Sequence, residues 1–194
     1  MTLVLIEGLN VKCFAAGVGC VGGVLVAGAL ELLLRDQIKM SGVLDSEWLY
    51  LYNLRKDNPI DLKAIIFAMI IVGAVGAVMD VAMSIASSLC EINEKSPDLP
   101  ARELLKSGLT IGRDIMGTMA NTLVLAYIGS ALCCMLLMVT YSSNVSQILN
   151  REQIAVEILQ ALAGSIGILA ALPLTAITSV LCLKPLNRIK RSVH

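Results

Sequence analysis

Four long apolar stretches, nearly free of charge, constrain this chain more than any other feature. They cover residues 13–30, 64–90, 115–150 and 158–183, and the only charged residue inside them is Asp80. Each approaches or exceeds the roughly 20 residues that an α-helix needs to cross a bilayer. The alternating pattern of a membrane β-strand is absent. The sequence therefore predicts an all-α, polytopic integral membrane bundle with about four transmembrane helices.

Composition agrees with that fold and argues against several functions. The chain has 194 residues, is 57% hydrophobic, and has a mean hydropathy of +0.80, more apolar surface than one soluble core can hide. Acidic and basic residues balance at 15 each, so no charged tail suggests nucleic acid. The single histidine is terminal and the six cysteines form no CxxC pair, which favours cysteines as small buried hydrophobes. We expect no metal, no cofactor and, lacking a nucleophile–base set, no enzymatic activity.

Three polar connections separate the apolar stretches, at residues 35–63, 91–114 and 141–152. The first contains WLYLYNL at 48–54, an aromatic pattern that predicts a short helix at the membrane surface. The second contains SPDLPARELL, which predicts a short cytoplasmic amphipathic helix. With four crossings, the N-terminal side, the second connection and the C-terminus carry nine basic residues against six on the other side. The positive-inside rule then makes the second connection and the C-terminus cytoplasmic.

A stripe of small and polar residues surrounds Asp80. The spacings are 3, 4, 4, 3 and 4 along the stripe, which places its members on one helix face; they are Gly73, Gly76, Asp80, Ser84, Ser87 and Glu91. If the hydrocarbon core begins near Ala64, Asp80 lies about 24 Å along the helix, in the inner half of the bilayer. A carboxylate is costly at that depth and indicates a function.

The next apolar stretch offers partners for this stripe. Its N-terminal part has polar residues on one face and beside it: Thr110, Arg113, Asp114, Gly117, Thr118, Asn121 and Thr122. Helices joined by a cytoplasmic loop are antiparallel, so their inner ends meet. We therefore expect Asn121, Thr118 and Thr122 to reach Asp80, and Arg113 to lie near Glu91.

Two hypotheses explain the polar stripe. In one, Asp80 takes and releases a proton or cation, with its protonation tuned by burial and by Asn121. In the other, the polar groups only hold helices together, by about a kcal/mol or less per hydrogen bond. The carboxylate favours the first hypothesis, because Ser, Thr and Asn alone would suffice for packing and a buried charge adds a desolvation cost.

Small residues also repeat at helical spacing. Those expected to permit close helix packing are Ala15, Gly19, Gly23, Gly73, Gly76 and Gly164. Pro173 either kinks the last helix as a gate or serves packing alone. Glu157 and Gln160 are expected at the outer interface. For Glu31 two interpretations stay open, outward snorkelling and the lining of a path.

The run GAVMDVAMSIASSLCEI at 76–92, followed by GRDIMGTMANTLVLAYIG at 112–129, resembles the YibE/F family of membrane proteins. The similarity continues through IDLKAIIFAMIIVGA at Ile60 and GSIGILAALPLTA at Gly164, so it covers nearly the whole chain as a single domain, residues 1–194. It implies a multi-pass protein of the bacterial inner membrane. Members of the family are commonly longer, and the short apolar start, residues 2–6, indicates a fragment or one half of a split system.

A fainter similarity of pattern links the chain to the membrane domains of SecD/SecF and of resistance–nodulation–division pumps, which use the proton motive force. The matching parts are Asp80 to Glu91, Pro100 to Leu109 and Arg113 to Thr122. Because the match is one of pattern, we treat it as an analogy. We expect a permease-like, proton- or ion-coupled transporter subunit with an unknown small substrate or ion. The alternative is a non-transporting scaffold. Beyond the lipid bilayer, the expected partner is a second membrane subunit or a further copy of this chain.

Overall fold

The computed structural model describes residues 11–38, 48, 61–141, 146 and 151–192. Its helices are α2 (Val11–Ile38), α4 (Leu62–Lys95), α5 (Ala101–Tyr141) and α7 (Glu152–Ser192). Each of the four is long and apolar enough to cross a membrane. The predicted all-α membrane bundle is therefore confirmed. Apart from Trp48, the expected surface helix lies outside the described residues, as does the apolar start.

The bounds of α4 follow from its polar ends. Asp61 caps the first turn, where its carboxylate accepts hydrogen bonds from the N–H groups of Lys63 (3.0 Å) and Ala64 (3.2 Å). At the other end, the Ser96 N–H donates to the Ile92 carbonyl at 2.9 Å. The 34 residues between these ends span about 50 Å, longer than the roughly 30 Å hydrocarbon core. The helix therefore tilts or projects from the membrane.

The expectation of a separate amphipathic helix between the second and third crossings is wrong. Only residues 96–100 separate α4 from α5, and α5 then continues for 41 residues. The Pro100 carbonyl accepts the N–H groups of Glu103 (3.0 Å) and Leu104 (3.1 Å), so helical bonding starts at once. The polar ARELL segment forms the first turns of α5. We call the end of the bundle that holds residues 96–100 the turn end.

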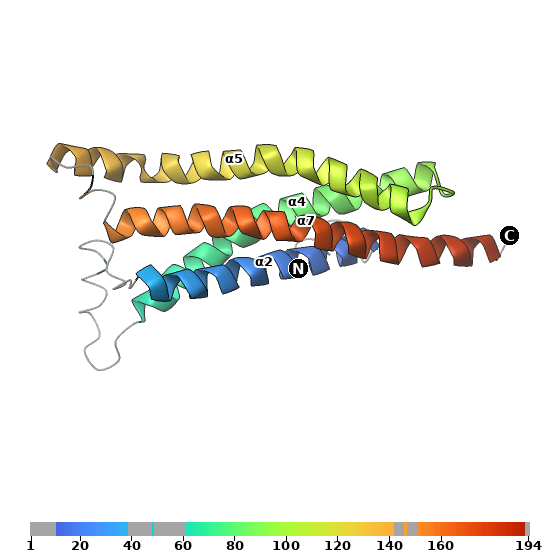
Figure 1. Cartoon of the computed structure of the whole chain (residues 1–194), viewed down its shortest axis with the longest axis horizontal. Helices are drawn as coiled ribbons and strands as arrows, with labels where there is room; N and C mark the ends of the chain where they lie inside the picture. The colour runs from blue at the N-terminus through green and yellow to red at the C-terminus, as the bar shows by residue number, and fades with distance from the viewer. Residues whose placement is uncertain (1–10, 39–47, 49–60, 142–145, 147–150, 193–194) are drawn as a thin grey trace.

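Helix α7 occupies the middle of the bundle (Figure 1). It packs against each of the other three helices, whereas α2 packs on α4 and α7 and α5 packs on α7 and α4. Helix α4 crosses the bundle diagonally; it contacts α2 from Phe67 to Ala86 and α5 from Gly73 to Leu89. Helix α7 continues as one helix through Pro173.

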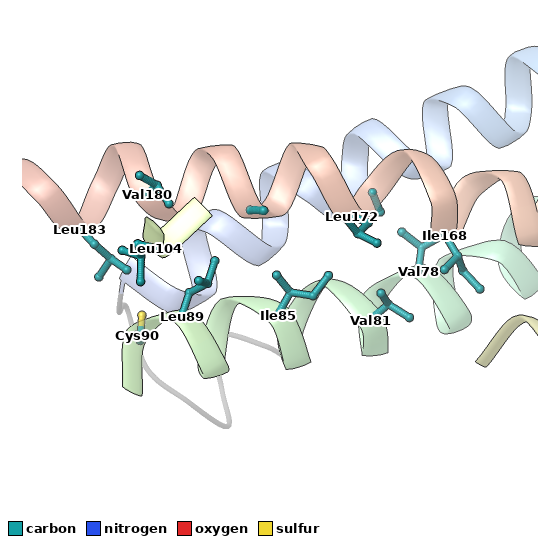
Figure 2. Close-up of a cluster of buried hydrophobic side chains, with 12 residues drawn as sticks. Val78, Val81, Ile85, Leu89, Cys90, Leu104, Ile168, Leu172, Val180 and Leu183 are labelled. Atoms are coloured by element: carbon teal, nitrogen blue, oxygen red, sulfur yellow. The ribbon is translucent and has the colours of Figure 1, made fainter. Parts of the chain in front are cut away.

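Interdigitated aliphatic side chains join α4, α5 and α7 near the turn end (Figure 2). The labelled residues of this cluster are Val78, Val81, Ile85, Leu89 and Cys90 from α4, Leu104 from α5, and Ile168, Leu172, Val180 and Leu183 from α7. The Lys184 ammonium donates a hydrogen bond to the Leu99 carbonyl, which attaches α7 to the α4–α5 connection. In lipid such packing stabilises through close contact rather than through removal of water.

Candidate functional site

Asp80 lies on the outer surface of α4. Its side chain is exposed and, within the part of the chain that the structure describes, its carboxylate makes no hydrogen bond or ion pair. One turn away, Gly76 is also exposed, and a Cβ atom built on it would meet nothing within 4 Å. We call Gly76 and Asp80 the open α4 face.

Contacts between α4 and α5 show which residues of α5 lie level with Asp80. A Cβ atom on Gly108 would lie 2.8 Å from Leu89, one on Gly112 3.0 Å from Ile85, and one on Gly73 2.7 Å from the Tyr127 hydroxyl. Because the helices are antiparallel and rise about 1.5 Å per residue, Asp80 lies level with about Thr118 of α5. The expected antiparallel contact between the end of α4 and the start of α5 is therefore confirmed.

The polar residues of α5 nevertheless point away from α4. The buried side of α5 carries Leu104, Gly108 and Gly112. The polar residues lie on the exposed side and define what we call the open α5 face: Asp114, Gly117, Thr118 and Asn121. Asn121 makes no hydrogen bond or ion pair among the described residues. The expectation that Asn121, Thr118 and Thr122 reach Asp80 is therefore wrong, because these side chains lie on the exposed side of α5.

Hydroxyl groups around Asp80 are satisfied by their own helices. Ser84 donates to the Asp80 carbonyl at 2.8 Å, and Thr118 donates to the Ile115 carbonyl at 2.9 Å. Thr122 donates to the carbonyls of Met119 and Thr118 at 2.9 and 3.2 Å. Ser87 is half-buried. The Ser84, Thr118 and Thr122 hydroxyl groups therefore already donate to backbone carbonyls of their own helices and not to the Asp80 carboxylate.

The expected pairing of Glu91 with Arg113 does not occur. Glu91 instead makes an ion pair of 2.7 Å with Lys95, one turn further along α4. Arg113 is exposed, and no ion pair to it is present among the described residues. An i,i+4 partner on the same helix is held near by the helix itself, which explains why it outcompetes a group on a neighbouring helix.

Most of the small residues singled out from the sequence lie at helix contacts. Ala15 is 1% exposed, and a Cβ atom on Gly19 would overlap the Thr175 side chain. A Cβ atom on Gly23 would lie 2.7 Å from the Gly167 carbonyl oxygen and 2.8 Å from both Ala171 and Val78. A Cβ atom on Gly164 would lie 2.7 Å from the Leu123 side chain. Gly76 is the exception, as described above.

Sequence reasoning missed a second polar region, further from the turn end. The Tyr127 and Gln160 side chains hydrogen-bond to each other, and both approach the bare backbone of Gly73. Glu157 lies on the same face of α7, three residues before Gln160. We call Tyr127, Glu157 and Gln160 the closed cluster. The spacing 157, 160, 164 places these residues on one helix face, which is the signal in the sequence for this region.

Glu31 is fully buried in the bundle, with 0% of its surface exposed. It lies one turn beyond Ala27, which packs with Ile70 and Ala163. Snorkelling outward, one of its two interpretations, is therefore wrong. Among the described residues, no group of three or more His, Cys, Asp or Glu side chains is placed to hold a metal ion.

Comparison with known proteins gives one match. A family model described as YibE/F-like protein matches residues 1–185. No curated protein and no solved structure matches the chain significantly.

Proposed function

This chain belongs to the YibE/F-like protein family, and from that premise we propose that it is one subunit of a permease-like assembly that couples proton or ion movement to transport of an unidentified substrate. It is a multi-pass membrane protein with four helices of spanning length. Asp80 is the proposed coupling carboxylate.

The exposed position of Asp80 carries this proposal. Asp80 lies 16 residues after Ala64 and 10 before Cys90 in the uncharged run, which is within the hydrocarbon region for a helix of this length. An ionisable group there faces the bundle interior, a water-filled cavity or a partner, because contact with acyl chains is too costly. Since Asp80 does not face the interior of this bundle, water or a second chain covers it in the membrane.

The open α5 face supports a partner rather than water alone. Of the most apolar 18-residue window of α5, 6% is buried, against 50% for α7. Polar groups and Gly117, beside which a Cβ atom would have open space, suit close approach by another membrane helix. The proposed partner is a second membrane subunit or another copy of this chain. It would complete the site around Asp80.

Orientation and location are part of the proposal. The excess of basic residues on the turn-end side supports a cytoplasmic turn and C-terminus, and family membership supports the bacterial inner membrane. We further propose a role without enzymatic chemistry.

A scaffold is the second candidate function. It is favoured by the local satisfaction of Ser84, Thr118 and Thr122 by their own backbones, which leaves an apolar-compatible surface for packing. In a scaffold Asp80 would be sealed by the partner and would not exchange protons.

The decisive experiment compares Asp80→Asn with the parent chain in inside-out membrane vesicles of the native host, with Glu94→Gln, on the exposed surface of the same helix, as the matched control. Proton flux is followed with a pH-sensitive dye, in sodium-containing and sodium-free buffers. We expect Asp80→Asn to abolish the flux that depends on this chain while its membrane level stays unchanged. Unaltered flux would exclude the coupling role, and a fall in abundance or assembly instead would favour the scaffold.

A further inference from the structure

Two contacts between α4 and α5 fix which of their residues lie at the same depth. A Cβ atom on Gly112 would lie 3.0 Å from the Ile85 side chain, and one on Gly108 would lie 2.8 Å from the Leu89 side chain. Because the helices are antiparallel, each residue further along α5 is level with one residue earlier on α4. Every exposed residue of one helix therefore has a counterpart at its own depth on the other.

The polar residues of the open α4 face and the open α5 face are counterparts of glycines. Asp80 is level with Gly117, and Asn121 is level with Gly76. Cβ atoms built on these two glycines would meet nothing within 4 Å, which permits close approach of another helix. Side chains lean toward the N-terminus of their own helix. On antiparallel helices, Asp80 and Asn121 therefore lean toward each other.

The match continues along the exposed sides of both helices. Further from the turn end, apolar residues are level with apolar residues. Nearer the turn end, a hydroxyl is level with a hydroxyl and an acid with a base. The level pairs are Met69 and Ile128, Val72 and Leu125, Ser87 and Thr110, and Glu91 and Lys106. Apart from the half-buried Ser87, these residues are exposed, so two exposed sides of one chain are complementary in chemistry and in spacing.

The other charged residues of this region are compatible with such a contact. Arg113 and Asp114 are exposed on α5 and lie level with Ser84 and Met83 of α4. Both side chains lean toward the turn end, whereas Asp80 leans away from it. The two carboxylates of a paired α4 and α5 are therefore directed apart, and Arg113 lies next to Asp114 in the chain.

The two open faces do not meet within one chain. Gly112 packs on Ile85 and on Leu172 of α7, and Asn121 lies on the opposite side of α5, because nine residues make about two and a half turns. Helix α7 packs against both α4 and α5, so it closes one side of that pair and leaves the other open.

A second copy can bring the faces together. A two-fold axis along the membrane normal keeps every residue at its own depth, and each copy then offers the same surface to the other. The open α4 face of one copy meets the open α5 face of the other with all level pairs in register. An amide N–H can donate to a carboxylate oxygen, so each copy supplies the donor that the Asp80 of its partner lacks.

We propose that a second copy of this chain covers Asp80, with the Asn121 amide of each copy donating a hydrogen bond to the Asp80 carboxylate of the other. The dimer holds two such sites, related by symmetry, and Gly76 and Gly117 allow the helices to approach. This inference rests on the proposed function, because it names the partner which that function requires, but the contact can be tested without measuring transport.

The test is disulfide cross-linking between two co-expressed copies that carry different affinity tags, in membranes of the native host. In one matched pair, the copies carry Val72→Cys and Leu125→Cys; in the other, they carry Ser87→Cys and Thr110→Cys. None of the four positions belongs to the polar site. The control pairs exchange the partners, Val72→Cys with Thr110→Cys and Ser87→Cys with Leu125→Cys, which places the substitutions 15 residues, or about 22 Å, apart in depth.

We expect oxidation to link the two tags in both matched pairs and to give only the background of tagged parent copies in the control pairs, because a disulfide needs Cβ atoms about 4 Å apart. No link in the matched pairs, or an equal yield in the control pairs, would overturn the proposal. So would a disulfide that forms only when both substitutions are in one copy, since the open α5 face would then cover α4 of its own chain.

Proton flux distinguishes failure of this proposal from failure of the proposed function. Linked copies together with unaltered flux in Asp80→Asn retain the dimer and remove the coupling role. Flux that depends on Asp80 without linked copies retains the coupling role and overturns the dimer. If the cysteine variants do not accumulate, two tagged parent copies must co-purify in mild detergent, and Gly117→Leu is expected to abolish their association. Parent copies that do not co-purify contradict the proposal.

Discussion

The open α4 face and the closed cluster are both polar, both lie on membrane-spanning helices, and differ in what covers them. Asp80 is exposed and makes no side-chain bond among the described residues, while Tyr127 and Gln160 bond to each other inside the bundle. A Cβ atom on Gly76 would meet nothing within 4 Å. The Tyr127 and Gln160 side chains, by contrast, lie against Gly73, one turn away.

The difference shows that polar residues on one helix can serve two separate surfaces. Gly73 and Asp80 are two turns apart and belong to one stripe in the sequence. At the level of Gly73, α5 and α7 both approach α4 and close the stripe, but at Asp80 the polar side of α5 is turned outward. The closed region can act within one chain, and the open region requires something outside it.

The largest effect on stability is expected in the tightly packed interior that both regions depend on. Gly23→Ala adds a methyl group 2.7 Å from a backbone oxygen of Gly167, so α2 and α7 must separate at a cost of about 1–3 kcal/mol. Gly17→Ala on the same helix meets nothing within 4 Å and serves as the control, with a gain of up to about 1 kcal/mol from helix propensity. Unfolding in detergent measures both, and equal stabilities would show that the bundle does not close at Gly23.

A smaller effect is expected at the closed cluster. Gly73→Ala places a methyl group against the Tyr127 hydroxyl and the Gln160 amide, which are the ends of side chains and can yield. We expect a loss of about 1 kcal/mol. Adding Tyr127→Phe removes the clashing oxygen, so the double variant is expected to lose less than the sum of the single changes. Strict additivity in this double-mutant cycle would separate Gly73 from Tyr127.

The smallest change in stability is expected on the open α4 face. Gly76→Leu fills space that is empty in the single chain. Beyond the gain in helix propensity that is also expected for Gly17→Ala, its effect on stability stays within about 0.5 kcal/mol. The same substitution blocks close approach of a partner helix, so co-purification of the partner or cross-linking between copies is expected to fall. Assembly that is unchanged would mean that the partner covers another surface.

Much of the fold could be predicted from residue type and spacing. The four apolar runs correspond to α2, α4, α5 and α7, because a helix in lipid satisfies its own backbone and needs only sufficient apolar length. Gly23 could be recognised as a contact from its four-residue repeat. The continuous start of α5 could not be predicted, because a proline such as Pro100 is equally common in a linker and just before a long helix.

For the candidate site, too, some features follow from the sequence and others only from the tertiary structure. The sequence by itself determined that Asp80 lies on a helix of spanning length and how far it is from each end of the apolar run. Only the tertiary structure decided that Asp80 faces outward, that Glu91 pairs with Lys95, and that Tyr127 and Gln160 meet beside Gly73. The rise of a helix fixes height from sequence alone, whereas the side of a helix that is covered depends on where its neighbours cross it.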